Sequence, residues 1–160
     1  MKLEITPLKK NKIKEIAKIA SENFSGLKDL KKAIKWITCN FNAFPRTQYF
    51  VIKSRNKILG YILWVEKGGF REKAVWELEQ LAIKKEVQKK GIGTELIKKS
   101  LLEIKQYLGK RKSTLKLIEI TTGKENEAQK IYQKALGAKV ECKIKDFFRT
   151  DEVIMIARYK

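Results

Sequence analysis

The chain has 160 residues, enough for one ordinary domain over residues 1–160 that buries most of its surface around one core. It contains no histidine, which excludes a Ser-His-Asp triad, a Cys-His pair, a histidine general base and every zinc site that uses histidine. Its 37 basic and 18 acidic residues give a formal charge of +19, a surplus that attracts polyanions.

The positive charge does not by itself identify a partner. Most of the basic residues are lysines, which are spread along the whole chain without a run longer than two. Dispersed lysine is typical of a solvated surface, so nucleic acid remains an alternative partner that is not favoured. A coenzyme with three phosphate groups would be attracted by the same field.

Neither a membrane segment nor a metal site is expected. The longest apolar stretch, residues 58–65, falls well short of the roughly 18 residues that span a bilayer. The N-terminus alternates charged and apolar residues and does not resemble a signal peptide, so a cytoplasmic protein is predicted. Cys39 and Cys142 lie far apart and outside any metal-ligand spacing, and we expect them to be buried free thiols.

The predicted elements alternate between strands and helices along the chain. In order, they are a strand at 3–5 ended by Pro7, helices over 10–24 and 27–40, strands over 48–53 and 57–65 joined as a hairpin, a strand over 74–83, a helix over 93–108, a strand over 115–121, a helix over 128–136, and strands over 138–144 and 152–157. This order predicts an α/β domain with a mixed sheet and helices on its faces. Trp36, Trp64 and Trp76 are expected in the core or in a substrate pocket.

The most informative segment is a glycine-bearing turn between a strand and an amphipathic helix. The strand ends with Leu81-Ala82-Ile83, and the turn reads Gln88-Lys89-Lys90-Gly91-Ile92-Gly93-Thr94. Backbone N–H groups at a helix N-terminus lack intrahelical partners and carry partial positive charge, so this turn predicts an anion site suited to a pyrophosphate. A P-loop would need a lysine directly after Gly93, and a dinucleotide fingerprint would need a third glycine at Leu96.

This segment resembles the acyl-CoA signature of the GNAT superfamily, Gln/Arg-x-x-Gly-x-Gly/Ala between a strand and a long helix. A second family element follows downstream, where Asn126, Ala128, Tyr132 and Leu136-Gly137-Ala138 are similar to the family's Asn…Ala…Tyr…Gly-Phe pattern. Ala138 departs from that pattern, because an aromatic residue is usual there. The resemblance covers nearly the whole chain and implies a GNAT-like acyl-CoA N-acyltransferase fold, with a mostly antiparallel sheet of about seven strands and helices on both faces.

The resemblance also implies how the chain would bind acetyl-CoA as a co-substrate, without a metal. The strand that ends at Ile83 would splay from its neighbour, expected to be residues 138–144, and its backbone would bind the pantetheine arm in the resulting gap. The residues implied in coenzyme binding are Leu81, Ala82, Ile83, Gln88, Lys89, Lys90, Gly91, Ile92, Gly93, Thr94, Asn126 and Tyr132.

Three residues are candidates for the chemistry. The resemblance implies that Tyr132 donates a proton to the coenzyme sulfur, and the alternative is that its ring is only part of the core. Period-two alternation predicts that Glu77 and Glu79 share one strand face with Leu81 and Ile83. Either carboxylate could act as the base, directly or through water, or could instead pair with lysines on the surface.

The expected function is N-acetyl transfer to a primary amine of a small molecule, protein or peptide. The first two helices and residues 144–149 are expected to border the acceptor. Two other classes remain open, namely a basic nucleic-acid-associated module and a non-catalytic acetyl-CoA sensor on the same fold. The chain is expected to be a monomer or a homodimer.

Overall fold

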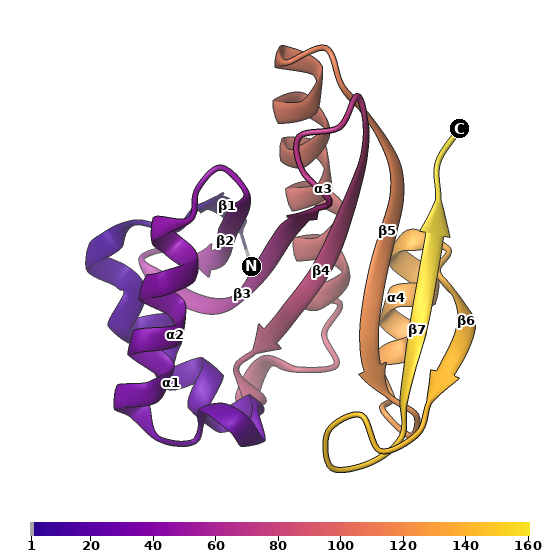
Figure 1. Cartoon of the computed structure of the whole chain (residues 1–160). Helices are drawn as coiled ribbons and strands as arrows, with labels where there is room; N and C mark the ends of the chain where they lie inside the picture. Colours follow the sequence, from indigo (N-terminus) through magenta and orange to yellow (C-terminus); the bar gives the residue numbers. More distant parts are fainter. Residues whose placement is uncertain (1) are drawn as a thin grey trace.

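The computed structural model describes residues 2–160 and places one mixed sheet at the centre of the molecule (Figure 1). The strands are β1 (Leu3–Pro7), β2 (Thr47–Ser54), β3 (Lys57–Lys67), β4 (Lys73–Ile83), β5 (Thr114–Gly123), β6 (Lys139–Ile144) and β7 (Glu152–Arg158). The α-helices are α1 (Ile13–Asn23), α2 (Leu30–Asn42), α3 (Ile92–Lys110) and α4 (Ala128–Leu136). Short 3-10 helices lie at Lys10–Lys12, Ser25–Leu27 and Lys85–Val87.

The sheet has seven strands in the order β1-β2-β3-β4-β5-β7-β6. All neighbouring strands are antiparallel except β4 and β5, which run parallel. A parallel pair requires a crossover connection, and α3 provides it. The predicted mixed α/β architecture, with a mostly antiparallel sheet and helices on both faces, is therefore confirmed.

The parallel pair separates before β4 ends. The register of β4 and β5 runs from Lys73 opposite Thr114 to Glu77 opposite Glu119, and residues 78–83 have no partner on β5. The expectation that β4 splays from residues 138–144 was wrong, because that segment forms the edge strand β6 and pairs only with β7. The sequence gives the order of strands along the chain, whereas the hairpin of β6 and β7 inserts β7 beside β5.

A β-bulge in β4 changes which side chains share a face. On β3, Leu63 lies opposite Gln80 and Trp64 lies opposite Leu78, so Glu79 is an extra residue. Before the bulge, odd-numbered residues such as Glu77 face away from α3, and after it Leu81 and Ile83 face toward α3. Glu77 and Glu79 share one face of β4, as predicted, but the prediction that Leu81 and Ile83 lie on the same face was wrong, since regular alternation does not continue through the bulge.

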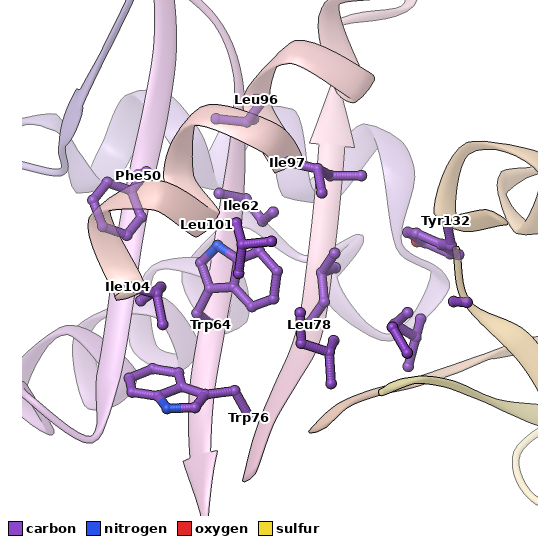
Figure 2. Packing of buried hydrophobic residues seen from close by; sticks show 14 of the residues in the cluster. Phe50, Ile62, Trp64, Trp76, Leu78, Leu96, Ile97, Leu101, Ile104 and Tyr132 are labelled. Atoms are coloured by element: carbon purple, nitrogen blue, oxygen red, sulfur yellow. The ribbon is translucent and has the colours of Figure 1, made fainter. Parts of the chain in front are cut away.

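Two apolar clusters, one on each face of the sheet, form the core. The first packs α3 and α4 against the sheet and contains Trp64, Trp76, Leu96 and Ile104 (Figure 2). The indole Nε1 of Trp64 donates to Ser100 Oγ at 2.9 Å, which satisfies a polar atom in that core. The second cluster packs α1 and α2 against strands β2 to β4 on the opposite face. The expected core roles of Trp64 and Trp76 are confirmed.

The start of the first helix and the burial of the two cysteines differ from expectation. The helix predicted from residue 10 begins at Ile13, after one 3-10 turn. Trp36 is 45% exposed on α2, outside the core, so its role in a substrate pocket stays a prediction. Cys39 and Cys142 are free, as predicted, but both are exposed, because they lie on the solvent side of α2 and on the edge strand β6. Within residues 2–160, no helix combines the length and apolarity that a bilayer span needs.

Candidate active site

The glycine turn presents free backbone donors at the start of α3. Gly91 is the N-cap residue with φ 77°, and no side chain caps this helix end. The first intrahelical bond runs from Glu95 N to Gly91 O, so the N–H groups of residues 92–94 lack intrahelical partners. A Cβ at Gly91 would meet no atom of residues 2–160 within 4 Å. The turn is therefore open to an anion, and glycine is required there by its positive φ.

The turn is also attached firmly to the end of β4. A Cβ on Gly93 would lie 3.7 Å from side-chain atoms of Leu81 and Ile83, which shows how closely the helix packs on this strand. Gln88 Nε2 donates to Ile83 O at 2.8 Å and to Asn23 Oδ1 at 3.4 Å. Gln88 thus holds the strand, the turn and the end of α1 together. The sequence analysis did not predict this contact of Asn23, because no motif around Asn23 indicates it.

Two lysines add positive charge beside these donors. Lys89 and Lys90 are exposed, and Lys89 has a positive φ of 60°. Ile92 and Gly93 are buried beneath the turn, whereas Thr94 is half-buried. The segment predicted to bind the diphosphate therefore divides into an exposed charged rim and a buried part that fixes its backbone.

Tyr132 lies on α4, in the core cluster on the α3 side of the sheet. It is 7% exposed, and Figure 2 shows its ring directed from α4 toward α3 and β4. Burial raises the pKa of Tyr132 to about 12, so the phenol keeps its proton at neutral pH. A protonated phenol is the form that a proton donor needs, and the buried ring also contributes to the core.

Asn126 fixes the start of α4. Its Oδ1 accepts the Ala128 N–H at 2.9 Å, and its Nδ2 donates to Thr122 Oγ1 at 3.0 Å. Because Thr122 belongs to β5, this side chain connects the helix that carries Tyr132 to the strand that leaves β4. The structure thus gives the predicted coenzyme contact Asn126 a definite local role, because its side chain binds the N–H of the first residue of α4 from just before the helix begins.

The two candidate carboxylates lie on the opposite face from Tyr132, in different surroundings. Glu77 lies 3.4 Å from Lys67 Nζ, and the same ammonium lies 2.9 Å from Glu119. Glu79, the bulged residue, has a buried Oε2 with no hydrogen-bond partner in residues 2–160. Burial and then the charge of Glu77 raise the pKa of Glu79, partly offset by Arg46 and Lys67. Glu79 is therefore better suited to accept a proton.

Two buried tyrosines, which the sequence reading missed, line the same face as Glu79. Tyr61 donates to Gln80 Oε1 at 3.0 Å, and the rings of Tyr49 and Tyr61 lie 5.9 Å apart. Burial raises the pKa of both hydroxyls, and the negative charge of Glu79 contributes in each case. One signal in the sequence could have indicated them, namely a tyrosine in each of two strands expected to be buried. A buried phenol hydroxyl needs a hydrogen-bond partner, so such a tyrosine points to a polar group nearby.

The separated strands therefore have a turn with free backbone N–H groups on one face and a carboxylate with a raised pKa on the other. A profile of the acetyltransferase (GNAT) family matches residues 13–138, which include β4, the glycine turn and Tyr132. The chain belongs to the GNAT family. Among curated proteins, the sequence has no significant match.

Solved structures share the fold of this GNAT protein at low sequence identity. The NatC complex bound to Gag peptide and CoA matches with a TM-score of 0.80 at 15% identity, covering 100% of both chains. The ribosomal-protein-S18-alanine N-acetyltransferase of Escherichia coli matches with 0.73 at 17%, covering 98% of this chain and 94% of that one. A variant of the spermidine N-acetyltransferase of Vibrio cholerae matches with 0.75 at 17%, covering 98% and 93%. These likenesses concern the fold, because the named acceptors differ.

Proposed function

We propose that this GNAT protein is an acetyl-CoA-dependent N-acetyltransferase that moves the acetyl group directly onto a primary amine. One observation carries the proposal: β4 and β5 separate after Glu77, and the separation is flanked by unpaired N–H groups on one face and by the Glu79 carboxylate on the other. Two reactants can therefore meet from opposite faces of the sheet. Family membership supports the reaction class.

The coenzyme would be held by backbone groups more than by side chains. The N–H groups at the start of α3 would bind the diphosphate, with Lys89 and Lys90 adding charge. The free edge of β4 over residues 81–83 would hydrogen-bond the pantetheine arm as an added strand would. Asn126 and Tyr132 complete the proposed contacts from the α4 side. When bound, acetyl-CoA supplies the activated acyl group.

The side chains around the gap would provide the proton transfers. Glu79 takes a proton from the amine, directly or through water, as the nitrogen bonds to the acetyl carbonyl carbon. Tyr132 gives its proton to the sulfur as the carbon–sulfur bond breaks, so the products are an amide and a thiol. Glu77 is the alternative base, and its ion pair with Lys67 makes it the weaker candidate. This direct transfer needs no histidine.

A thiol-release assay with acetyl-CoA and a broad panel of amines tests the proposal. We expect Tyr132→Phe to lower kcat about 100-fold while the Kd for acetyl-CoA stays unchanged, because a proton donor acts on the reaction and not on coenzyme affinity. Tyr159→Phe, a conservative change at a half-buried tyrosine on the α3 side, is the matched control.

The outcomes separate the competing functions. Unchanged turnover in Tyr132→Phe would remove this residue from its role. Binding of acetyl-CoA without turnover on any amine would indicate a non-catalytic sensor. A crystal of the complex with the coenzyme diphosphate lodged away from residues 91–94 would contradict the proposed binding site.

A further inference from the structure

The sheet face opposite α3 carries charges of both signs in two separate places. The acidic end consists of Glu77 and Glu79 on β4 and Glu119 on β5. The basic hollow, with a volume of about 670 Å³, lies at the turn between β3 and β4 and is lined by Lys67, Arg71, Lys73 and Lys116 together with Glu72. Lys67 joins the two places, since its ammonium contacts Glu77 and Glu119.

Two oxygens at or beside the acidic end are buried without a hydrogen-bond partner in residues 2–160. Besides Glu79 Oε2, the hydroxyl of Tyr49 is buried without a hydrogen bond in residues 2–160, and Tyr49 is only 5% exposed. Asn40 lies beside that hydroxyl and its side chain lowers the pKa of Tyr49, while its amide donates to Trp36 O at 3.2 Å. Tyr49 lies opposite Leu63 of β3, and Leu63 lies opposite Gln80, the neighbour of Glu79. Tyr49 and Glu79 therefore lie two strands apart on the same face of the sheet. An ammonium group, which has three N–H donors, would satisfy both oxygens.

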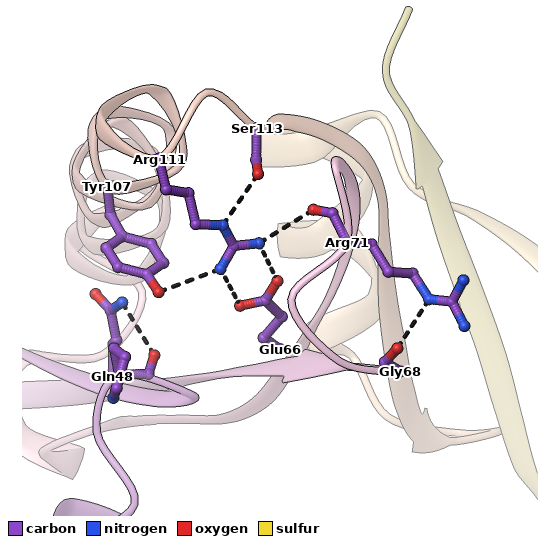
Figure 3. Close-up of polar contacts among 8 residues, drawn as sticks. Gln48, Glu66, Gly68, Arg71, Tyr107, Arg111 and Ser113 are labelled. Atoms are coloured by element: carbon purple, nitrogen blue, oxygen red, sulfur yellow. Dashed lines mark hydrogen bonds and ion pairs between the residues drawn. The ribbon is translucent and has the colours of Figure 1, made fainter.

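Three of the four cations that line the basic hollow form no ion pair within residues 2–160, and only Lys67 is paired. Lys73 and Lys116 are exposed and form no ion pair within residues 2–160. Arg71 donates only to the Gly68 carbonyl, at 2.9 Å, and Figure 3 shows its guanidinium directed away from the Glu66–Arg111 pair. These three cations face one carboxylate, that of Glu72, so the hollow favours an anionic ligand group.

The distance between the two places limits the length of the ligand. Val75 lines the hollow and lies four positions before Glu79 on the same strand, which corresponds to ~13 Å at the rise of a β-strand. An extended peptide covers that distance with about four residues. A polyamine of the same length would place a second ammonium among the lysines, where like charges repel.

Deepening the proposed function, on which this inference rests, we propose that the acceptor is the N-terminal amine of an extended peptide with an acidic side chain at about its third to fifth residue. The ammonium binds Glu79 and Tyr49 before losing a proton, and the peptide runs along the open face toward the β3–β4 turn. Its acidic side chain then lies between Lys73, Lys116 and Arg71.

Matched six-residue peptides test this in the thiol-release assay with the full chain and acetyl-CoA. The peptides share their first two residues and carry Asp, Ala or Lys at positions 3–5. We expect kcat/KM for the Asp series to exceed that for the Ala series about tenfold, with the Lys series lowest. Added salt should reduce the preference, because exposed charges are screened.

Charge reversal in the hollow provides the second arm. The double variant Lys73→Glu with Lys116→Glu should lose the preference for Asp peptides and improve the Lys series. The double variant Lys98→Glu with Lys134→Glu makes the same change in net charge at exposed positions on α3 and α4, on the other face of the sheet, and should keep the wild-type order. Thermal unfolding of both variants confirms that they are folded.

The results distinguish this inference from the proposed function. Turnover of peptides regardless of their charge, or a preference for polyamines or other small amines, would overturn the acidic-peptide acceptor while leaving N-acetyl transfer in place. Turnover on no amine at all would contradict both proposals. An order of preference that is identical in the hollow variant and the control variant would likewise overturn the role of the basic hollow.

Discussion

Glu66 on β3 and Glu79 on β4 are two carboxylates on neighbouring strands that differ in whether a partner neutralises their charge. Glu66, 1% exposed in its side chain, faces α3 and is bound in a bidentate pair by Arg111, whose Nη1 donates to Glu66 Oε2 at 2.7 Å (Figure 3). Arg111 Nε also donates to Ser113 Oγ at 3.0 Å, and Nη1 to the Tyr107 hydroxyl at 3.2 Å. Glu79 has a buried oxygen without a hydrogen-bond partner among residues 2–160.

The difference separates a structural carboxylate from an available one. A buried charge costs free energy unless it is paired and hydrogen-bonded, and Arg111 provides both to Glu66. No comparable partner compensates Glu79, so its charged form is disfavoured and its pKa is raised. A group kept in that state is ready to take a proton, and the rest of the fold must offset its cost.

Removing Arg111 tests the structural member of this comparison and should have the largest effect. Arg111→Ala leaves the Glu66 carboxylate buried and unpaired, and we expect the free energy of unfolding to fall by about 3–5 kcal/mol. Urea denaturation measures the loss, with Arg149→Ala, at an exposed arginine outside any ion pair of residues 2–160, as the control. A loss below about 1 kcal/mol, the range of a surface pair, would show that Glu66 finds other partners.

Glu79→Gln tests the available member. We expect kcat to fall about 100-fold, equivalent to about 2.7 kcal/mol, because a general base is lost. The free energy of unfolding should stay the same or rise, because the amide removes a charge that is buried without a partner. Glu77→Gln is the matched control and should reduce kcat much less. A stable Glu79→Gln protein with full turnover would refute the proposed base.

The pH dependence of turnover tests the same role of Glu79, because the proposed base predicts the direction in which turnover changes with pH. The base must be ionised, and burial raises the pKa of Glu79, so wild-type turnover should decline as pH falls through a value above that of an ordinary glutamate. Tyr132, with a pKa near 12, stays protonated throughout that range. In Glu79→Gln the acid limb of the pH–rate profile should disappear. An unchanged limb would assign it to another group.

Asn126 extends the comparison to a polar side chain that is satisfied but exposed, and its effect should be the smallest. Asn126→Ala removes the bond to the Ala128 N–H, so we expect a loss of about 1 kcal/mol in the free energy of unfolding. The Kd for acetyl-CoA of the same variant separates this structural hydrogen bond from the proposed coenzyme contact. A weaker Kd supports the contact, and an unchanged Kd limits Asn126 to the bond with Ala128.

Sequence periodicity predicted the elements of this fold, because the apolar side chains of each helix and strand must recur at the spacing that turns them toward a core. The glycine turn was predictable for a similar local reason, since Gly91 must adopt a positive φ where α3 begins. The neighbour of β4 was not predictable in this way. Strand order depends on how the β6–β7 hairpin docks against β5, and no local pattern records that.

The candidate site was predicted in its residues but only partly in its geometry. Glu77 and Glu79 were found from their position on the strand before the turn, yet the bulge that separates them from Leu81 and Ile83 leaves no sign in the residue types. Tyr49 was missed because an aromatic residue in an apolar strand is normally core. Its unpartnered hydroxyl becomes visible only when the neighbouring strands are in place.

The bulge at Glu79 adds a single residue to β4, so the two halves of this strand direct equivalent side chains to opposite faces of the sheet. Before the bulge, side chains of β4 that face away from α3 can be substituted, which in the proposed function would change the choice of amine. The packing beneath the glycine turn, which residues after the bulge provide, would stay the same. In the proposed function, the acceptor amine and acetyl-CoA would thus contact separate stretches of the same strand. Evolution or protein design can therefore change the residues before the bulge without altering the residues after it.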